Sequence, residues 1–298
     1  MANLKEVKGR IQSVTSTQQI TKAMKMVAAA KLRRAQDKIM QMRPYSQKLS
    51  GIIQNVSASV DTESIENPFA EVRDVERVLL VVVSSDRGLC GAFNNNVFKF
   101  TRRLIDEKYA EVEQHGGLFI MPLGKRSLDF FTKRQYNVVD RYWDQFGKVS
   151  FDVAIDAAEY AMAEFDSGYY DKVEIVYNEF KNVATQIVKA ENFLPIEDDP
   201  AEKDEEVSND VDYIFEPDRE FIFQEIIPKS LKIQFYKAVL ESNAAEHGAR
   251  MTAMGQATDN AGELLKELKL TYNRTRQAAI TKEILEIVGG AEALAQGG

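Results

Sequence analysis

The 298-residue sequence has little of the chemistry on which disulfides and metal sites depend. It contains one cysteine, Cys90, and two histidines, His115 and His247, which lie far apart in the chain. A single cysteine excludes an internal disulfide and fits a reducing compartment. Neither histidine has cysteines at metal-ligand spacing, and neither can be paired with a nucleophile from sequence. We therefore expect no metal site, no cofactor site and no catalytic residues.

Long apolar runs are also missing. No segment approaches the roughly 18 apolar residues that cross a bilayer, and the opening MANLKEVKGR lacks the apolar core of a secretory signal. We therefore expect a protein that does not span a bilayer and that stays in the compartment where it is made. With 44% hydrophobic and 28% charged residues, the chain can form one medium globular core together with extended helices.

Proline is absent from residues 1–43 and 229–298. In the second stretch, small or apolar residues recur at steps of four and three, and only a histidine and a threonine interrupt the series. Its members are Leu240, Ala244, His247, Met251, Met254, Thr258, Ala261, Leu265, Leu268 and Tyr272. This 3.5-residue period is typical of a coiled-coil helix. Seventy helical residues would extend roughly 105 Å, whereas a compact chain of this size is about 50 Å across. We therefore expect a helix that projects and needs partners.

The N-terminal stretch carries a similar pattern. Its apolar residues are spaced three, four and three apart from Leu4 to Val14, and they resume out of phase after residues 15–19, at Ile20, Met24 and Val27. Such a slip predicts a local change of supercoil.

Three glycines of the C-terminal stretch, Gly248, Gly255 and Gly262, share one helix face because they lie seven residues apart. Each costs about 1 kcal/mol of helix propensity relative to alanine, which close packing against a second helix would offset. We predict that helices at 1–58 and 219–298 pair as a long antiparallel coiled coil. An ordinary amphipathic helix with tolerated glycines is the alternative.

Charge is distributed unevenly. Residues 1–43 carry ten basic and two acidic residues, a balance of +8, although the whole chain has a formal net charge of −8. The segment 197–212 holds nine acids and one lysine, which is typical of a solvated loop. Residues 1–43 contain no Phe, Tyr or Trp, so the aromatic residues expected of a nucleic-acid surface are missing. An acidic protein is therefore the expected partner of the basic helix, and nucleic acid is not.

Between the helical ends, strand and helix patterns alternate. The run VLLVVVS at 78–84 is typical of a strand buried on both faces of a parallel sheet. Other expected strands are 118–123, 137–142, 173–177 and 183–188, and expected helices lie near 97–105, 127–134 and 151–165. This order predicts an α/β, Rossmann-like domain at 75–195, inserted between the two coiled-coil helices and followed by an acidic loop at 196–218.

The turn SSDRGLCGAFN at 84–94 lies between a predicted strand and a predicted helix, where phosphate and dinucleotide sites are built. It contains neither GxGxxG nor GxxxxGK[ST]. We therefore interpret Asp86, Arg87 and the following glycines as a turn that closes the domain. A nucleotide-binding α/β enzyme with helical appendages and a static coiled-coil scaffold stay open as alternatives.

Three segments in the same order resemble one known family: ITKAMKMVAAAK at 20–31, SSDRGLCGAFN at 84–94, and the stretch from ARMTAMGQATDNAGELL to EIVGGAEAL at 249–294. They are similar to the gamma subunits of rotary F-type ATP synthases, and the similarity covers essentially the whole chain. The resemblance implies a non-catalytic central shaft that enters the hexamer of alternating alpha and beta subunits. It also implies that the α/β domain helps to join the shaft to the epsilon subunit and the c-subunit ring, on the cytoplasmic side of a bacterial membrane.

The same resemblance implies which residues contact the beta subunits. A basic face on the N-terminal helix would meet acidic lever segments, and two residues of the C-terminal helix match positions that engage an acidic catch loop. Guanidinium, ammonium and amide donors suit carboxylate acceptors. The implied contact residues are Lys22, Met24, Lys25, Lys31, Arg276 and Gln277. A merely exposed charged helix face is the alternative for the last two.

Overall fold

The computed structural model describes residues 4–59, 67–144, 151–196 and 219–296. The chain forms two compact units, Met1–Val27 with Met251–Gly298, and Ala28–Arg250. The acidic segment 197–212 lies outside the described residues, so the loop expected at 196–218 stays a prediction, as do the other expected domain boundaries.

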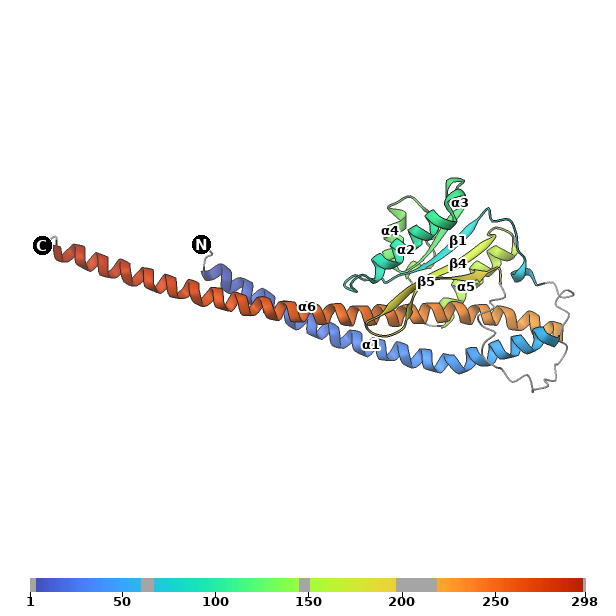
Figure 1. The fold of residues 1–298 in the computed structure, drawn as a ribbon, viewed down its shortest axis with the longest axis horizontal. Helices are drawn as coiled ribbons and strands as arrows, with labels where there is room; N and C mark the ends of the chain where they lie inside the picture. The colour runs from blue at the N-terminus through green and yellow to red at the C-terminus, as the bar shows by residue number, and fades with distance from the viewer. Residues whose placement is uncertain (1–3, 60–66, 145–150, 197–218, 297–298) are drawn as a thin grey trace. The chain divides into compact units, whose positions relative to one another are not determined.

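Two long helices carry the ends of the chain: α1 (Leu4–Ser59) and α6 (Arg219–Gln296). They lie side by side and run antiparallel within each unit (Figure 1). Each helix contains one proline, Pro44 in α1 and Pro228 in α6, and continues through it. The predicted antiparallel pair of terminal helices is therefore confirmed.

In the first unit the two helices meet along a narrow seam. On α6 the predicted seam residues Met254, Ala261 and Leu265 are buried, and Leu268 and Tyr272 are half-buried. Residues of α1 lie buried or half-buried at seven-residue intervals, at Val7, Val14 and Thr21. Apolar area removed from water along this seam stabilises the pair.

The predicted phase slip in α1 is wrong. Ile20 and Val27 are 59% and 57% exposed, whereas Thr21 is only 9% exposed. The seam continues in phase because its polar residues are hydrogen-bonded across the pair. The Thr258 hydroxyl donates to the Thr21 hydroxyl at 2.8 Å, and Gln18 Nε2 donates to the Thr258 carbonyl at 3.4 Å. A polar residue can therefore occupy a buried seam position when it is hydrogen-bonded, even where the pattern of apolar residues predicts a different seam.

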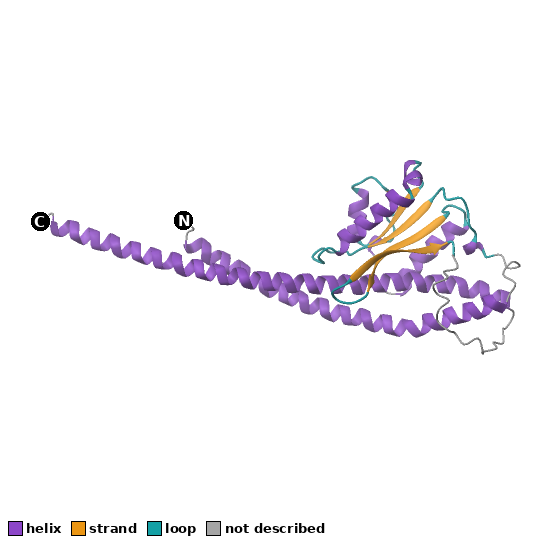
Figure 2. Cartoon of the chain, in the orientation of Figure 1, coloured by secondary structure: helices purple, strands orange, loops and turns teal. Residues whose placement is uncertain are grey.

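The second unit contains a five-stranded sheet in the order β3-β2-β1-β4-β5. Its strands are β1 (Val78–Val83), β2 (Leu118–Leu123), β3 (Asn137–Val138), β4 (Lys172–Phe180) and β5 (Gln186–Leu194). The first four are parallel, and β5 runs antiparallel to β4. Helices lie on both faces of the sheet, so the predicted α/β architecture is confirmed (Figure 2).

Strand β1 is fully buried because each of its faces is covered. Residues such as Val78 and Leu80 pack with α2 (Phe93–Lys108) and α4 (Lys125–Thr132), and the short α3 (Ala110–Gln114) follows α2. The opposite residues, such as Val81, pack with α5 (Phe151–Asp166) and with α6. A short 3-10 helix, η2 (Pro68–Ala70), precedes the strand.

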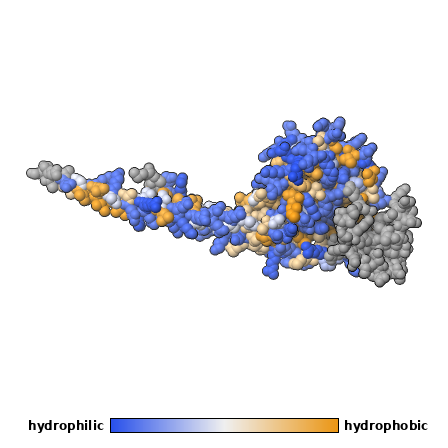
Figure 3. Space-filling model, viewed as in Figure 1, coloured by the Kyte–Doolittle hydropathy of each residue, from blue (hydrophilic) through white to orange (hydrophobic). Residues whose placement is uncertain are grey.

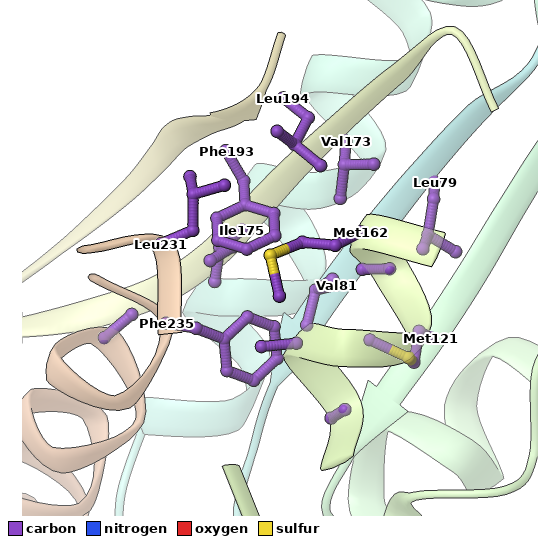
Figure 4. Packing of buried hydrophobic residues seen from close by; sticks show 14 of the residues in the cluster. Leu79, Val81, Met121, Met162, Val173, Ile175, Phe193, Leu194, Leu231 and Phe235 are labelled. Carbon is purple, nitrogen blue, oxygen red and sulfur yellow. The ribbon is translucent and has the colours of Figure 1, made fainter. Parts of the chain in front are cut away.

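Helix α6 is part of this core. The rings of Phe193 on β5 and Phe235 on α6 meet edge to face, with centroids 5.6 Å apart, and Leu231 lies beside them (Figure 4). Both rings are at most 1% exposed. Burial of aromatic rings at this contact anchors the sheet to the helix.

Several expected strands have different bounds. The strand expected at 173–177 spans Lys172–Phe180. The strand expected at 137–142 pairs only over Asn137–Val138, at the sheet edge. The strand expected at 183–188 begins later and extends to Leu194. The polar residues of β5 obscured its full length in the sequence. In the structure they are paired with β4, because Tyr177 donates to Glu191 at 2.6 Å and Lys189 donates to Glu179 at 3.1 Å.

Candidate partner-contact surface

The four contact residues expected on α1 lie along its surface but not on one face. Lys22, Lys25 and Lys31 are exposed, and Met24 is half-buried. Lys22 directly follows the buried Thr21, whereas Lys31 directly precedes the buried Leu32. At 100° per residue these positions fall on opposite flanks of the seam. The contact of these residues with a partner stays a prediction.

Lys25 lies across the seam over a glycine of α6. A Cβ placed on Gly255 would come within 3.4 Å of the Lys25 ammonium and within 3.6 Å of its Cε. The lysine stem packs its methylenes on the helix at Gly255 and leaves its charge at the surface, and these distances are ordinary van der Waals contacts. A Cβ placed on Gly248 would lie 3.2 Å from the ring of Phe180, so that glycine packs against the sheet. Gly262 likewise faces Gln18, whose Nε2 would lie 3.0 Å from an added Cβ.

Arg276 and Gln277 lie on a part of α6 that extends past α1. Leu4, the first described residue of α1, falls near Thr275 if the antiparallel register of Thr21 and Thr258 continues. Every described side chain from 276 to 292 is exposed. Large apolar residues are among them: Ile280, Ile284, Leu285, Ile287 and Val288. Figure 3 shows apolar side chains at the surface of this end of α6.

An exposed apolar stretch on α1 was not expected from the sequence. Ile20, Ala23, Met26 and Val27 are exposed on the side of α1 away from the seam. The interpretation of Ile20 and Val27 as seam residues concealed this outer surface. Exposed apolar residues gathered on one helix face are typical of a protein interface.

The turn after β1 is tied to the start of α4. Asp86 Oδ1 accepts from the Lys125 amide at 3.2 Å, and the Ser84 hydroxyl accepts from the Ser127 amide at 2.8 Å. Burial raises the pKa of Asp86, and the bond from Lys125 opposes that rise. Gly124 is required here because its φ is 112° and an added Cβ would lie 2.2 Å from the Ser84 carbonyl oxygen.

Helix α6 covers the carboxyl end of β1. Cys90 and Phe93 pack against the fully buried Ala245 of α6. Arg250 Nη2 donates to the carbonyls of Arg87 at 3.0 Å and Gly88 at 3.3 Å. In doubly wound domains this end of the sheet is where phosphates bind. Here the position is taken by the chain's own helix.

Glu246 and Arg250 were missed in the sequence. The sequence feature that could have identified them is a Glu and an Arg four residues apart within a run of small residues, AAEHGAR. In the structure most residues of this run are buried. Cys90 is free and buried. The described residues include no group of three or more His, Cys, Asp or Glu that could hold a metal ion. None of the described helices is long and apolar enough to cross a membrane.

Residues 3–294 match the sequence profile of a family described as ATP synthase. Among curated relatives, the ATP synthase gamma chain of Cytophaga hutchinsonii is 58% identical over 294 residues, which cover 99% of each chain. That of Chloroherpeton thalassium is 52% identical over 306 residues, again covering 99% of each chain.

Solved structures with the same fold include two from the mitochondrial ATP synthase of Euglena gracilis. A chain of the structure titled OSCP/F1/c-ring, rotational state 3, is 24% identical with a TM-score of 0.65, covering 99% of this chain and 95% of that one. A chain of the structure titled rotor, rotational state 1, is 23% identical with a TM-score of 0.60, covering 93% of this chain and 98% of that one.

Proposed function

The chain belongs to the gamma-chain family of ATP synthases, and from this membership we propose that it is the central rotor shaft of an F-type ATP synthase. In that role it couples ion flow through the membrane sector to ATP synthesis or hydrolysis in the alpha/beta hexamer. The observation that carries the proposal is the end of α6 beyond Thr275, whose described side chains are exposed and include five large apolar residues. A hexamer that surrounds this helix would bury them.

A rotor must be asymmetric if it is to place three catalytic sites in different states. The paired helices are asymmetric, because α6 extends beyond α1. Differential contacts at each shaft angle would bias each site differently, which is the requirement for coupling between angle and affinity.

The chain itself is proposed to be non-catalytic. The carboxyl end of β1, where a nucleotide phosphate would bind, is in contact with Ala245 and Arg250 of α6. The sequence also lacks both common phosphate-binding motifs. The full-length chain should therefore show no stoichiometric ATP binding at micromolar concentration. Binding that disappears in Asp86→Ala would overturn this part of the proposal.

The proposed partners are the alpha and beta subunits, the epsilon subunit and the c-subunit ring. Lys22, Lys25 and Lys31, together with Met24, would contact acidic lever segments of the beta subunits. In this assembly the chain is peripheral to a bacterial cell membrane, on its cytoplasmic side. Native-level purification of the tagged chain should recover these subunits in stoichiometric amounts, and a probe fixed to the chain should rotate during ATP hydrolysis. A complex that hydrolyses ATP while the probe stays fixed would support a static scaffold instead.

Arg276 and Gln277 are proposed to contact a beta-subunit carboxylate rather than to hold the fold. Both are exposed, so alanine at both positions should leave α6 intact. Charge-assisted hydrogen bonds contribute about 1.5–3 kcal/mol when well formed, so ATP synthesis and hydrolysis should fall roughly ten- to a hundredfold in the assembled complex. The measurement compares the ATP turnover of the purified complex with its subunit stoichiometry.

Lys229→Ala is a matched control, because Lys229 is an exposed cation on the same helix, paired with Glu225. It should assemble and turn over as the wild type does. Wild-type turnover by the assembled Arg276→Ala, Gln277→Ala complex would refute the contact, and failure to assemble would assign the two residues a structural role.

A further inference from the structure

A charged pair of α6 reaches into the turn between β1 and α2. Arg250 Nη1 contacts Glu246, and the two side chains are 12% and 8% exposed. Arg250 Nη2 donates to the carbonyls of Arg87 at 3.0 Å and Gly88 at 3.3 Å. One guanidinium therefore joins a carboxylate of its own helix to two carbonyls of the α/β domain.

Burial and the contact with Arg250 act in opposite directions on the charge of Glu246. Burial raises the pKa of Glu246, and the charge and hydrogen bond of Arg250 oppose that rise, with a smaller contribution from Lys31 of α1. A buried carboxylate that is held beside a guanidinium orients the planar fork of that guanidinium. Its second nitrogen is then directed at the turn. Arg250 Nη1 also lies 3.3 Å from His247 Nδ1.

The turn is fixed to α6 at a second point as well. Cys90 is 1% exposed and packs with Phe93 against Ala245. Its sulfur lies 3.3 Å from Asn94 Nδ2, which donates to it. Leu89 lies between the two fixed points, with a φ of 65° and a side chain that is 64% exposed. A non-glycine residue keeps such a backbone conformation only where neighbouring contacts hold it.

We propose that Arg250 is a positioning residue that locks the β1–α2 turn onto α6, and that Glu246 orients it. The contact makes the α/β domain turn together with the helix that forms the shaft. This mechanical consequence rests on the proposed rotor function, whereas the lock itself does not. Without the two carbonyl bonds, the turn would open and the apolar core around Phe235 alone would hold the α/β domain to α6, so the domain would yield at a lower torque.

Cys90 is a native reporter of the lock, because it is the only cysteine in the sequence and is a buried residue of the turn. The rate at which a thiol reagent labels Cys90 in the full-length chain measures opening of the turn. Arg250→Ala should raise that rate about ten- to a hundredfold, the factor expected for loss of a charge-assisted hydrogen bond. Arg250→Lys should recover only part of the protection, because an ammonium lacks the planar fork.

Lys229→Ala is the matched control, since Glu225 and Lys229 form an exposed pair on α6 with the same four-residue spacing. Its labelling rate should equal that of the wild type. If Arg250→Ala does not fold, Glu246→Gln keeps the shape of the carboxyl group and should raise labelling by a smaller factor. Wild-type labelling in Arg250→Ala, or in Glu246→Gln where only that variant folds, would overturn the lock.

The mechanical role is tested in the assembled complex. Arg250→Ala should retain ATP hydrolysis but pump fewer ions per ATP hydrolysed, and Lys229→Ala should keep the wild-type ratio. Faster Cys90 labelling with an unchanged pumping ratio would overturn the mechanical role and leave the lock standing. A wild-type chain that fails to assemble with ATP synthase subunits would refute the rotor function instead, while the labelling assay would still decide whether the lock exists.

Discussion

Two stretches of the single helix α6 have opposite surroundings. Every residue from 230 to 250 is buried or half-buried, whereas every described residue from 276 to 292 is exposed. Both stretches carry large apolar side chains, such as Phe235 in the first and Ile287 in the second. The chain is therefore helical in both stretches, whether or not other parts of the same chain bury the side chains. The difference separates the part of α6 that holds its own domain together from the part that is left for a partner.

The comparison also gives the two stretches different expected sensitivities. Removing a side chain from the first stretch leaves a cavity in a packed core. Removing one from the second stretch changes only hydrated surface until a partner binds, so its effect appears in assembly rather than in the stability of the chain.

The largest expected difference in the free energy of unfolding is between Phe235→Ala and Ile287→Ala. Phe235 is fully buried against Phe193, whereas Ile287 is 71% exposed. Phe235→Ala should lower the free energy of unfolding by about 3–5 kcal/mol, and Ile287→Ala by no more than about 0.5 kcal/mol. Urea unfolding of the purified chain measures both. Equal losses would show that the two stretches are not distinct in the free chain.

The seam between the helices should be nearly as sensitive. Leu265 is 8% exposed and Leu268 is half-buried, so aspartate at both positions places unpaired charges on the seam. We expect a loss of about 2–4 kcal/mol, less than for a fully buried charge because the seam borders water. Leu264→Asp with Leu270→Asp is the control, since these leucines are 44% and 60% exposed. The seam is misassigned if the control pair is the more destabilising, as judged by unfolding and by the yield of complex.

His247 makes the buried stretch sensitive to pH. Burial, with the charges of Arg250 and Lys31, lowers its pKa from the usual 6.5 to about 4. Between pH 6.5 and 4 the unfolded chain takes up a proton that the folded chain does not, so stability falls as the pH falls. The loss should be about 1–3 kcal/mol.

The neighbouring Glu246 opposes this trend because its pKa is raised, so the effect is best measured as a difference. The stability of wild type minus that of His247→Gln should decrease from pH 7 to pH 4 and should be constant above pH 7. A difference that does not change with pH would show that His247 is not held neutral in the folded chain.

The smallest expected effects concern two glycines of the seam. Gly255→Ala gains up to about 1 kcal/mol of helix propensity and requires only that the flexible Lys25 ammonium, 3.4 Å from the new Cβ, shift slightly. Gly262→Ala should gain less, because its Cβ would lie 3.0 Å from Gln18 Nε2 and would disturb the bond from Gln18 to Thr258. Gly289→Ala has nothing within 4 Å and serves as the control. Thermal unfolding that ranks Gly262→Ala above Gly255→Ala would contradict this account.

Local pattern in the sequence was sufficient for the helices and for most of the sheet. The 3.5-residue period from Leu240 to Tyr272 located the seam of α6, and the apolar run at 78–83 located a strand buried on both faces. These features depend on side-chain periodicity, which the sequence displays directly. The expected contact residues on the two long helices are exposed apart from Met24, but their contact with a partner is still a proposal.

The tertiary structure alone decided where polar residues are buried. Thr21 and Gln18 join the seam because Thr258 lies opposite them, and β5 extends to Leu194 because its charged residues find partners on β4. Arg250 lies in a buried stretch because the carbonyls of the β1–α2 turn are within reach, and Glu246 does so because Arg250 contacts it. An apolar side chain is stabilised by any covered surface, so its position follows from local periodicity. A polar side chain is stable in the interior only beside a specific partner, and that partner lies far away in the sequence.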